Sequence, residues 1–232
     1  MNTKYHLKSL EQSIIATFVI ISLLAITFFA VEPKVGQAIA GTPFTIKQTI
    51  TGEISFTTQA PNVTMTGNLN GVTGGTANGT TTAVVTTNNS NGYTMTIAFT
   101  NNTTDNAMLG ESSLSTSIRD YPASSSEPTY GFYTSSSSAV FGYSVTASTT
   151  SDLDASFKHD GASLCNTGAT VTPGVCWMEP QTSSFQIINR GTAATSGATT
   201  TISFKVHVPN APSPAVVTDV YTATATLTAL NI

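Results

Sequence analysis

The segment "SDLDASFKHDG", residues 151–161, holds the densest cluster of side chains that could bind a metal ion. Asp152, Asp154 and Asp160 supply three carboxylates, and His159 directly precedes the last of them. Carboxylates at alternate positions of a loop can converge on Ca²⁺, because hard cations take several oxygen ligands. The EF-hand pattern does not continue after Asp154, where "AS" follows. A solvated turn is therefore the favoured interpretation, Ca²⁺ binding is the alternative, and no other cofactor is implied.

Two cysteines, Cys165 and Cys176, lie in the part of the chain that we expect to be exported. An even number of cysteines in an oxidising compartment favours a disulfide. A metal site would need more partners than the nearby His159 supplies. We therefore predict a disulfide that closes a small loop around the turn at Pro173 and Gly174.

Several aromatic side chains could contact a ligand. Trp177, the only tryptophan, directly follows the second cysteine and could stack on a sugar ring or pack against the disulfide and the core. Tyr121, Tyr130 and Tyr133 could form a platform for polysaccharide. They alternate with serine and glycine as half-buried strands do, so packing is the favoured interpretation for both sets.

Catalytic and nucleic-acid functions are not supported by the residue types. After the N-terminal segment, histidines occur only at His159 and His207, and no nucleophile elbow, glycine-rich phosphate loop or helical metal motif is present. We assign no catalytic residue and predict that the protein is not an enzyme. Eight lysines and arginines in the whole chain cannot neutralise a run of phosphates, so nucleic acid is excluded as a partner.

Triplets of the form Asn-x-Ser/Thr occur five times. Such triplets arise by chance in a chain this rich in asparagine and threonine, and they predict surface loops more securely than glycans. They begin at Asn62, Asn78, Asn88, Asn101 and Asn102.

The N-terminus has the pattern of an export signal. Two lysines precede an apolar stretch at residues 13–30, and a small-x-small triplet ends at Ala40. We predict a signal peptide over residues 1–40, cleaved after Ala40, and a secreted or cell-surface domain over residues 41–232. The apolar core is nearly long enough to span a bilayer, so an uncleaved anchor through residues 13–30 remains the alternative and is the one predicted contact with a membrane.

Alternating apolar and polar residues predict an all-β domain. The clearest segments are residues 44–50, 53–58, 62–67, 80–88, 92–101, 139–147 and 199–208. With shorter segments they make about nine or ten strands, separated by Gly, Asn, Pro and Ser clusters, as in a single antiparallel β-sandwich of immunoglobulin-like or jelly-roll-like type. Residues 88–92, "NNSNG", are predicted to form a hairpin turn.

The two ends of the domain are predicted to have different roles. The closing stretch "DVYTATATLTALNI", residues 219–232, alternates small apolar residues with threonines, which favours a strand that closes its own sandwich. Residues 41–50 follow directly on the predicted cleavage point. They are the better candidate for a strand that joins another molecule.

Three stretches resemble small secreted β proteins of bacterial surfaces: "FTIKQTITGEISFTT", the cysteine pair ending in "CW", and "PSPAVVTDVYTATATLTALNI". The last is similar to the C-terminal part of WxL-type cell-wall-binding domains. Thr226, Leu227 and Thr228 stand where such a domain has its second Trp-x-Leu, and no binding residue is carried across. The resemblance implies a β domain on the cell surface.

These observations favour a non-enzymatic structural or interaction protein of the cell envelope, acting in adhesion or surface association. Its expected partners are envelope components or other copies of itself. The first alternative is a pilus or filament subunit assembled by donor-strand complementation, with residues 41–50 as the donor. The second is a carbohydrate-binding module that takes polysaccharide.

Overall fold

The computed structural model describes residues 3–30, 45–100, 106–113, 115–122 and 127–232, and within the helix it describes the side chains of residues 11–26. The chain divides into two units, Met1–Thr49 and Ile50–Ile232. Three parts of the sequence predictions lie outside the described residues. They are the cleavage point after Ala40, residues 41–44 of the predicted joining segment, and the triplets at Asn101 and Asn102.

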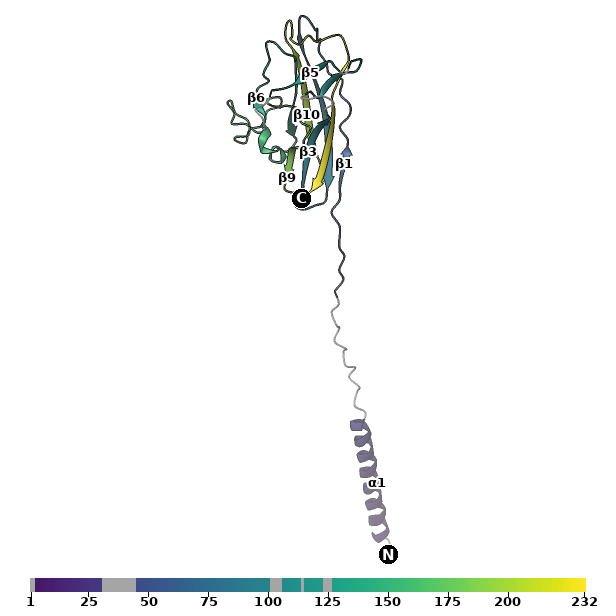
Figure 1. Cartoon of the computed structure of the whole chain (residues 1–232). Helices are drawn as coiled ribbons and strands as arrows, with labels where there is room; N and C mark the ends of the chain where they lie inside the picture. Colours follow the sequence, from purple (N-terminus) through teal and green to yellow (C-terminus); the bar gives the residue numbers. More distant parts are fainter. Residues whose placement is uncertain (1–2, 31–44, 101–105, 114, 123–126) are drawn as a thin grey trace. The chain divides into compact units, whose positions relative to one another are not determined.

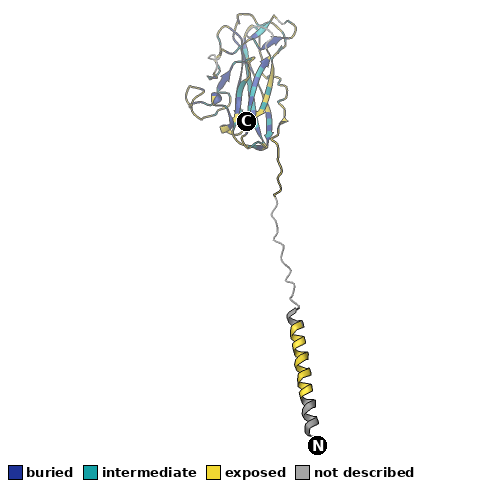
Figure 2. Cartoon of the chain, turned by 60° about the horizontal axis from the view of Figure 1, so that its bottom comes forward, coloured by how far each residue is buried: buried dark blue, intermediate teal, exposed yellow. Residues whose placement is uncertain are grey.

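The first unit contains helix α1 (Thr3–Ala30), which includes the apolar stretch of the predicted signal. The side chains of residues 11–26 are exposed (Figure 2). Among the described residues, no helix has the combination of length and apolar character that crossing a membrane requires. Residues 45–50 are exposed and form no strand, so the predicted strand at 44–50 is absent over its described part.

The second unit is all-β, as predicted (Figure 1). Two short 3₁₀ turns, Thr150–Asp152 and Ala155–Phe157, interrupt the strands. The strands are β1 (Ile54–Thr58), β2 (Gly75–Thr87), β3 (Tyr93–Thr100), β4 (Met108–Gly110), β5 (Ser117–Asp120), β6 (Thr129–Tyr130), β7 (Val140–Ala147), β8 (Cys176–Met178), β9 (Phe185–Arg190), β10 (Ala194–Val208), β11 (Tyr221–Thr222) and β12 (Thr224–Asn231).

The strands form two sheets. The larger sheet has the order β1-β2-β10-β7-β5-β4-β11, and β8 pairs with β7 and β6 beside it. The smaller sheet has the order β12-β3-β9. All strand pairs are antiparallel except β5 and β7, so the fully antiparallel prediction is wrong at this pair. The connection from β5 to β7 is long enough for a parallel crossover and carries β6 on its way.

The core lies where the faces of the two sheets meet. Tyr93, Met95, Ile97 and Phe99 of β3 are at most 4% exposed, which confirms the face predicted from their alternation. Phe99 reaches the larger sheet, where its ring centroid lies 6.2 Å from that of Phe141. Figure 2 shows the same alternation as buried positions along the strands.

The turn at residues 88–92 does not close a hairpin. It joins β2 of the larger sheet to β3 of the smaller one, so the hairpin prediction is wrong although the turn itself is present. The Gly92 N–H donates to the Asn89 carbonyl (3.0 Å). Gly92 has φ +82°, and an added Cβ would lie 1.8 Å from the Arg190 carbonyl oxygen. The Asn-Gly signal identifies a tight turn but does not say which sheet follows it.

The C-terminal strand pairs with the chain's own fold, as predicted. Thr224–Asn231 (β12) is antiparallel to β3, with Leu227 opposite Ile97. Its inward face is less covered than its small residues suggested, because Leu227 and Ala229 are half-buried and Ala225 is exposed. Ala225 borders a cavity between the sheets.

Candidate functional site: a groove between the two sheets

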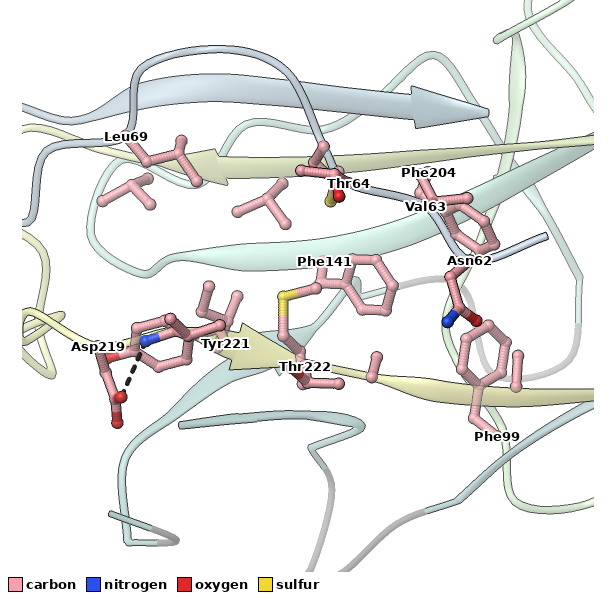
Figure 3. A pocket seen from close by; sticks show the side chains of 18 of the residues that line it. Asn62, Val63, Thr64, Leu69, Phe99, Phe141, Phe204, Asp219, Tyr221 and Thr222 are labelled. Atoms are coloured by element: carbon pink, nitrogen blue, oxygen red, sulfur yellow. Dashed lines mark hydrogen bonds between the residues drawn. The ribbon is translucent and has the colours of Figure 1, made fainter. Parts of the chain in front are cut away.

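A cavity of about 650 Å³ lies between two segments that are distant in sequence. One rim comes from residues 60–71, between β1 and β2, and the other from residues 216–227, which include β11 and the start of β12. In Figure 3, Val63 and Leu69 lie on the first rim and Tyr221 on the second, with Phe141 between them. We call this cavity the intersheet groove.

The floor of the intersheet groove is apolar because strands of both sheets turn one face toward it. Ile202, Phe204, Val206 and Val208 of β10 line it at alternate positions, and alternate residues of a strand share a face. Further floor residues are Ile97 and Phe99 of β3, Met108 of β4, Ile118 of β5 and Phe141 of β7.

The two rims approach each other closely at one end of the groove. There Gly71 approaches the second rim so closely that an added Cβ would lie 2.1 Å from the Val216 carbonyl oxygen, so a side chain does not fit. Val63, Met65 and the residues of β12 are exposed or half-buried, so the groove opens to solvent. Outside the groove, Thr87 Oγ1 of β2 lies 2.8 Å from Asn231 Oδ1 of β12.

A free strand edge runs along the second rim. β12 bonds to β3 on one side, and no strand in the described part of the chain pairs with its other side. A strand edge of this kind presents backbone N–H and C=O groups that an added strand can pair with. The groove therefore places an apolar floor beside a backbone edge.

One charged side chain, Asp219, occurs among the described residues that line the groove. Its Oδ1 accepts hydrogen bonds from the backbone N–H groups of Val220 (2.8 Å) and Ser112 (3.1 Å). Around it the rim is apolar, with Val220 61% and Val217 48% exposed. Exposed apolar side chains beside an open apolar cavity are typical of a surface that binds another molecule.

The Ca²⁺ hypothesis requires the three aspartates of the "SDLDASFKHDG" segment to converge on one point. In the structure their carboxylates have separate partners. The Asp152 carboxylate pairs with Arg190. Asp154 accepts from Ser156 Oγ (2.7 Å) and from Gln186 Nε2 (2.6 Å). Asp160 accepts from the backbone of its own loop. Within the described residues no group of three His, Cys, Asp or Glu side chains is placed to hold a metal ion.

Asp160 is the exposed anchor of that loop. Its Oδ1 accepts the N–H groups of Ala162 (2.9 Å), Ser163 (2.8 Å) and Leu164 (3.0 Å), and these bonds lower its pKa from 3.8 to about 2. Hydrogen bonds to a carboxylate favour its charged form. A carboxylate with a lowered folded-state pKa contributes stability above its unfolded pKa, and that contribution disappears as the pH falls through the folded value.

We expect the Asp160→Asn variant to lose less stability than the unaltered protein between about pH 4 and pH 2. Urea unfolding midpoints of both proteins at several pH values in this window measure the difference. Parallel midpoint curves for the two proteins would contradict the role assigned to the Asp160 carboxylate.

The predicted disulfide is present. The sulfurs of Cys165 and Cys176 are bonded, with a Cα separation of 5.9 Å. Cys165 forms a β-bridge with His159, and Cys176 is the first residue of strand β8. The disulfide therefore connects the loop around His159 to β8.

Trp177 is packed in the interior. It is 2% exposed, its Nε1 donates to the Gly174 carbonyl (2.7 Å), and its ring meets that of Phe132 edge to face at 5.0 Å. Lys205 Nζ lies 4.7 Å from the Trp177 ring centroid, and burial lowers the pKa of this lysine. The buried ring leaves no face for the ligand contact considered from the sequence.

The three tyrosines do not form a platform. Tyr121 is fully buried, its hydroxyl donates to the Gly131 carbonyl (3.0 Å), and it accepts the Tyr133 N–H (3.0 Å). Tyr130 is half-buried beside His159, with ring centroids 5.5 Å apart. Tyr133 is 57% exposed and is the member of the three that a ligand can reach.

The described glycosylation triplets lie in three settings. Asn62 is exposed on the first rim of the groove. Asn78 is exposed but lies within β2, contrary to the prediction of a loop. Asn88 is exposed in the turn before β3, where its amide oxygen accepts the Glu53 N–H (2.6 Å) and its Nδ2 donates to the Thr51 carbonyl (3.2 Å).

The groove was not predicted from the sequence. The segment at residues 62–67 was expected to be a strand, but it forms a single bridge, between Thr66 and Asn78, and otherwise serves as a rim. A partial signal lay in the small residues before and within β12. Ala223, which precedes this strand, and Ala225 within it leave space where larger side chains would fill the gap between the sheets.

Comparison of the chain with models of protein families, with curated proteins and with solved structures finds no match. The resemblance to WxL-type domains therefore stays a prediction.

Proposed function

We propose that this chain is a non-enzymatic, exported protein of the cell surface, folded as a β-sandwich, that works by association. Its binding site is the intersheet groove, and its ligand is an extended, apolar polypeptide segment that pairs with the free edge of β12. The observation that carries this proposal is the apolar cavity of about 650 Å³ with an unpaired strand edge along its rim. Backbone pairing gives affinity in this mode of recognition, and pockets for alternate side chains give specificity.

Export is supported by the sulfur chemistry and by the N-terminal pattern. The disulfide between Cys165 and Cys176 is of the kind that persists in oxidising compartments. The lysines, apolar stretch and small-x-small triplet of residues 1–40 have the order of a signal peptide.

A binding role fits the histidines better than a catalytic one. His159 is 3% exposed, and its Nδ1 accepts the Gly161 N–H (3.0 Å), so Nε2 carries the ring proton toward Thr172 Oγ1 (3.1 Å). His207 Nδ1 lies 3.1 Å from Thr76 Oγ1, and burial and the charge of Lys205 lower its pKa. Both rings have structural partners away from the groove.

Carbohydrate binding receives less support. A sugar platform needs exposed ring faces, but Trp177 and Tyr121 are buried, Tyr130 is half-buried, and Tyr133 is the one candidate that is exposed. The groove walls are lined mainly by aliphatic side chains, which suit an apolar segment better than a hydroxylated sugar.

The binding role of the groove is tested by a substitution that fills it with a large side chain. Ala225 is exposed and lines the groove, whereas Thr226 is exposed and points away from it on the same strand. We expect Ala225→Trp to weaken association roughly tenfold or more, equivalent to about 1.4 kcal/mol, because the indole occupies the space of the ligand. Thr226→Trp is the matched control. The full chain, produced in an export-competent host, is measured by sedimentation and by retention on isolated cell envelopes.

Thermal unfolding of both variants shows whether the fold is intact, and small shifts are expected because both positions are exposed. Equal association of the Ala225→Trp and Thr226→Trp proteins would overturn the assignment of the groove.

A further inference from the structure

If the groove binds a polypeptide segment, as proposed above, a segment of this same chain is a candidate for its occupant. We propose that residues 45–50 of a second copy of this chain fill the intersheet groove as an added strand next to β12. Each copy then accepts the N-terminal segment of one neighbour and offers its own to another.

The segment has the side chains that the groove requires. Ile46 and Ile50 are each 82% exposed, the highest values among the large apolar side chains of the described residues. In an extended strand both lie on one face with Gln48 between them, while Lys47 and Thr49 lie on the other. Residues 45–50 form no strand within their own chain. The two exposed isoleucine side chains are stabilised when another surface covers them.

The lengths of the segment and the floor agree. The floor positions of β10 run from Ile202 to Val208 at every second residue, a span of roughly 20 Å at about 3.3 Å per residue. Six residues in strand conformation, 45–50, cover roughly 17 Å by the same measure. Ile46 and Ile50 can therefore both face the floor without leaving the groove.

The charges are also compatible. Lys47 is the one charged residue of the segment, and Asp219 is the one charged residue among the described lining of the groove. Their signs are opposite. The remaining residues of the segment are uncharged, and Lys47 lies on the face opposite Ile46 and Ile50, so insertion places no charge against the apolar floor.

The residues that follow the segment are anchored at the turn after β2. The Glu53 carbonyl accepts from Thr87 Oγ1 (2.6 Å), and Asn88 bonds to the backbone of Glu53 and Thr51. β1 starts directly afterwards and pairs with β2, with Ile54 opposite Thr87. Insertion into the same chain would break these contacts, whereas insertion into a neighbour leaves them intact.

The consequence is an open assembly. The donor segment and the acceptor groove are different surfaces of one chain, so each contact is head-to-tail and leaves a free donor and a free groove at the ends. Repetition of a contact that does not close into a ring produces a filament.

The test is a disulfide cross-link between the donor segment of one copy and the groove of another, and the two copies carry different tags. One copy carries Ile46→Cys and the other carries Ala225→Cys, and both full chains are produced together in an export-competent host. The native cysteines are already paired with each other, so they do not compete for the new thiols. We expect a disulfide-linked species containing both tags, roughly tenfold more abundant than with Thr226→Cys in place of Ala225→Cys, because Thr226 faces away from the groove.

A matched pair in the segment completes the test. Ile46→Asp is expected to abolish self-association, and Thr49→Asp, with the same charge on the opposite face, is expected to retain it. Equal yields of the two-tag species with Ala225→Cys and Thr226→Cys would overturn the proposal, as would retained self-association in Ile46→Asp. If Ala225→Trp still weakens association while Ile46→Asp does not, the groove keeps its function and a different segment fills it. If neither weakens association, both proposals fail.

Discussion

Replacing Trp177 by alanine is expected to lower the free energy of unfolding by about 3 to 5 kcal/mol, the range for a large aromatic side chain removed from a core. The ring is 2% exposed and contacts Phe132 and Lys205. Its loss also leaves the Gly174 carbonyl without the indole N–H. The cavity and the lost hydrogen bond act in the same direction.

Urea unfolding of the full chain measures this effect. Tyr133→Ala is the control, since this ring is 57% exposed and its removal should change stability by about 0.5 kcal/mol or less. A Trp177→Ala protein of unchanged stability that no longer adheres to isolated cell wall would contradict the structural role and return Trp177 to ligand binding.

Replacing Arg190 by methionine is expected to cost about 3 to 5 kcal/mol of stability, because it leaves a buried carboxylate without its partner. The side chains of Arg190 and Asp152 are 17% and 10% exposed and form an ion pair. Arg190 Nε also donates to the Thr192 carbonyl (2.9 Å) and Nη2 to the Ala193 carbonyl (2.9 Å). Tyr93 lies close by, and burial together with the Asp152 charge raises its pKa to about 12.

The double variant Arg190→Met with Asp152→Leu separates the two contributions to that loss. We expect it to be more stable than Arg190→Met alone, because no unpaired charge remains in the interior. Denaturant unfolding at neutral pH gives the four free energies, those of the unaltered protein, the two single variants and the double variant. If the second substitution adds its own full cost, the pair is not coupled and the explanation for the single variant is wrong.

The fold was predictable where alternation and burial agree. β3 and β10 show their inward faces in the sequence, and the structure buries Tyr93, Met95, Ile97 and Ile202. The disulfide was also predictable from the cysteine count together with the predicted export signal. These features depend on local pattern or on simple chemistry, which a single sequence contains.

Strand pairing was less predictable, because pairing depends on residues distant in sequence. The turn at 88–92 connects different sheets, and β5 lies parallel to β7. Residues 62–67 alternate like a strand yet follow the rim of a groove. Alternation shows that a segment is able to form a strand. Whether it does so depends on the neighbouring strands with which it can pair.

The candidate site was less predictable than the fold. The clustered aspartates suggested metal ligands, but each carboxylate has a separate structural partner. The groove carries no motif, because its lining comes from many strands and two rims far apart in sequence. The position and alternation of residues 41–50 predict a joining segment, and this role stays a prediction.

Hydrogen exchange of the full chain over a range of concentrations tests the central claim most directly. Protected amides report backbone hydrogen bonds that open rarely. We predict that the amides of residues 45–50 and those of the free edge of β12 become protected together as the chain associates. Association that leaves residues 45–50 exchanging as fast as an unstructured peptide at every concentration would contradict the account.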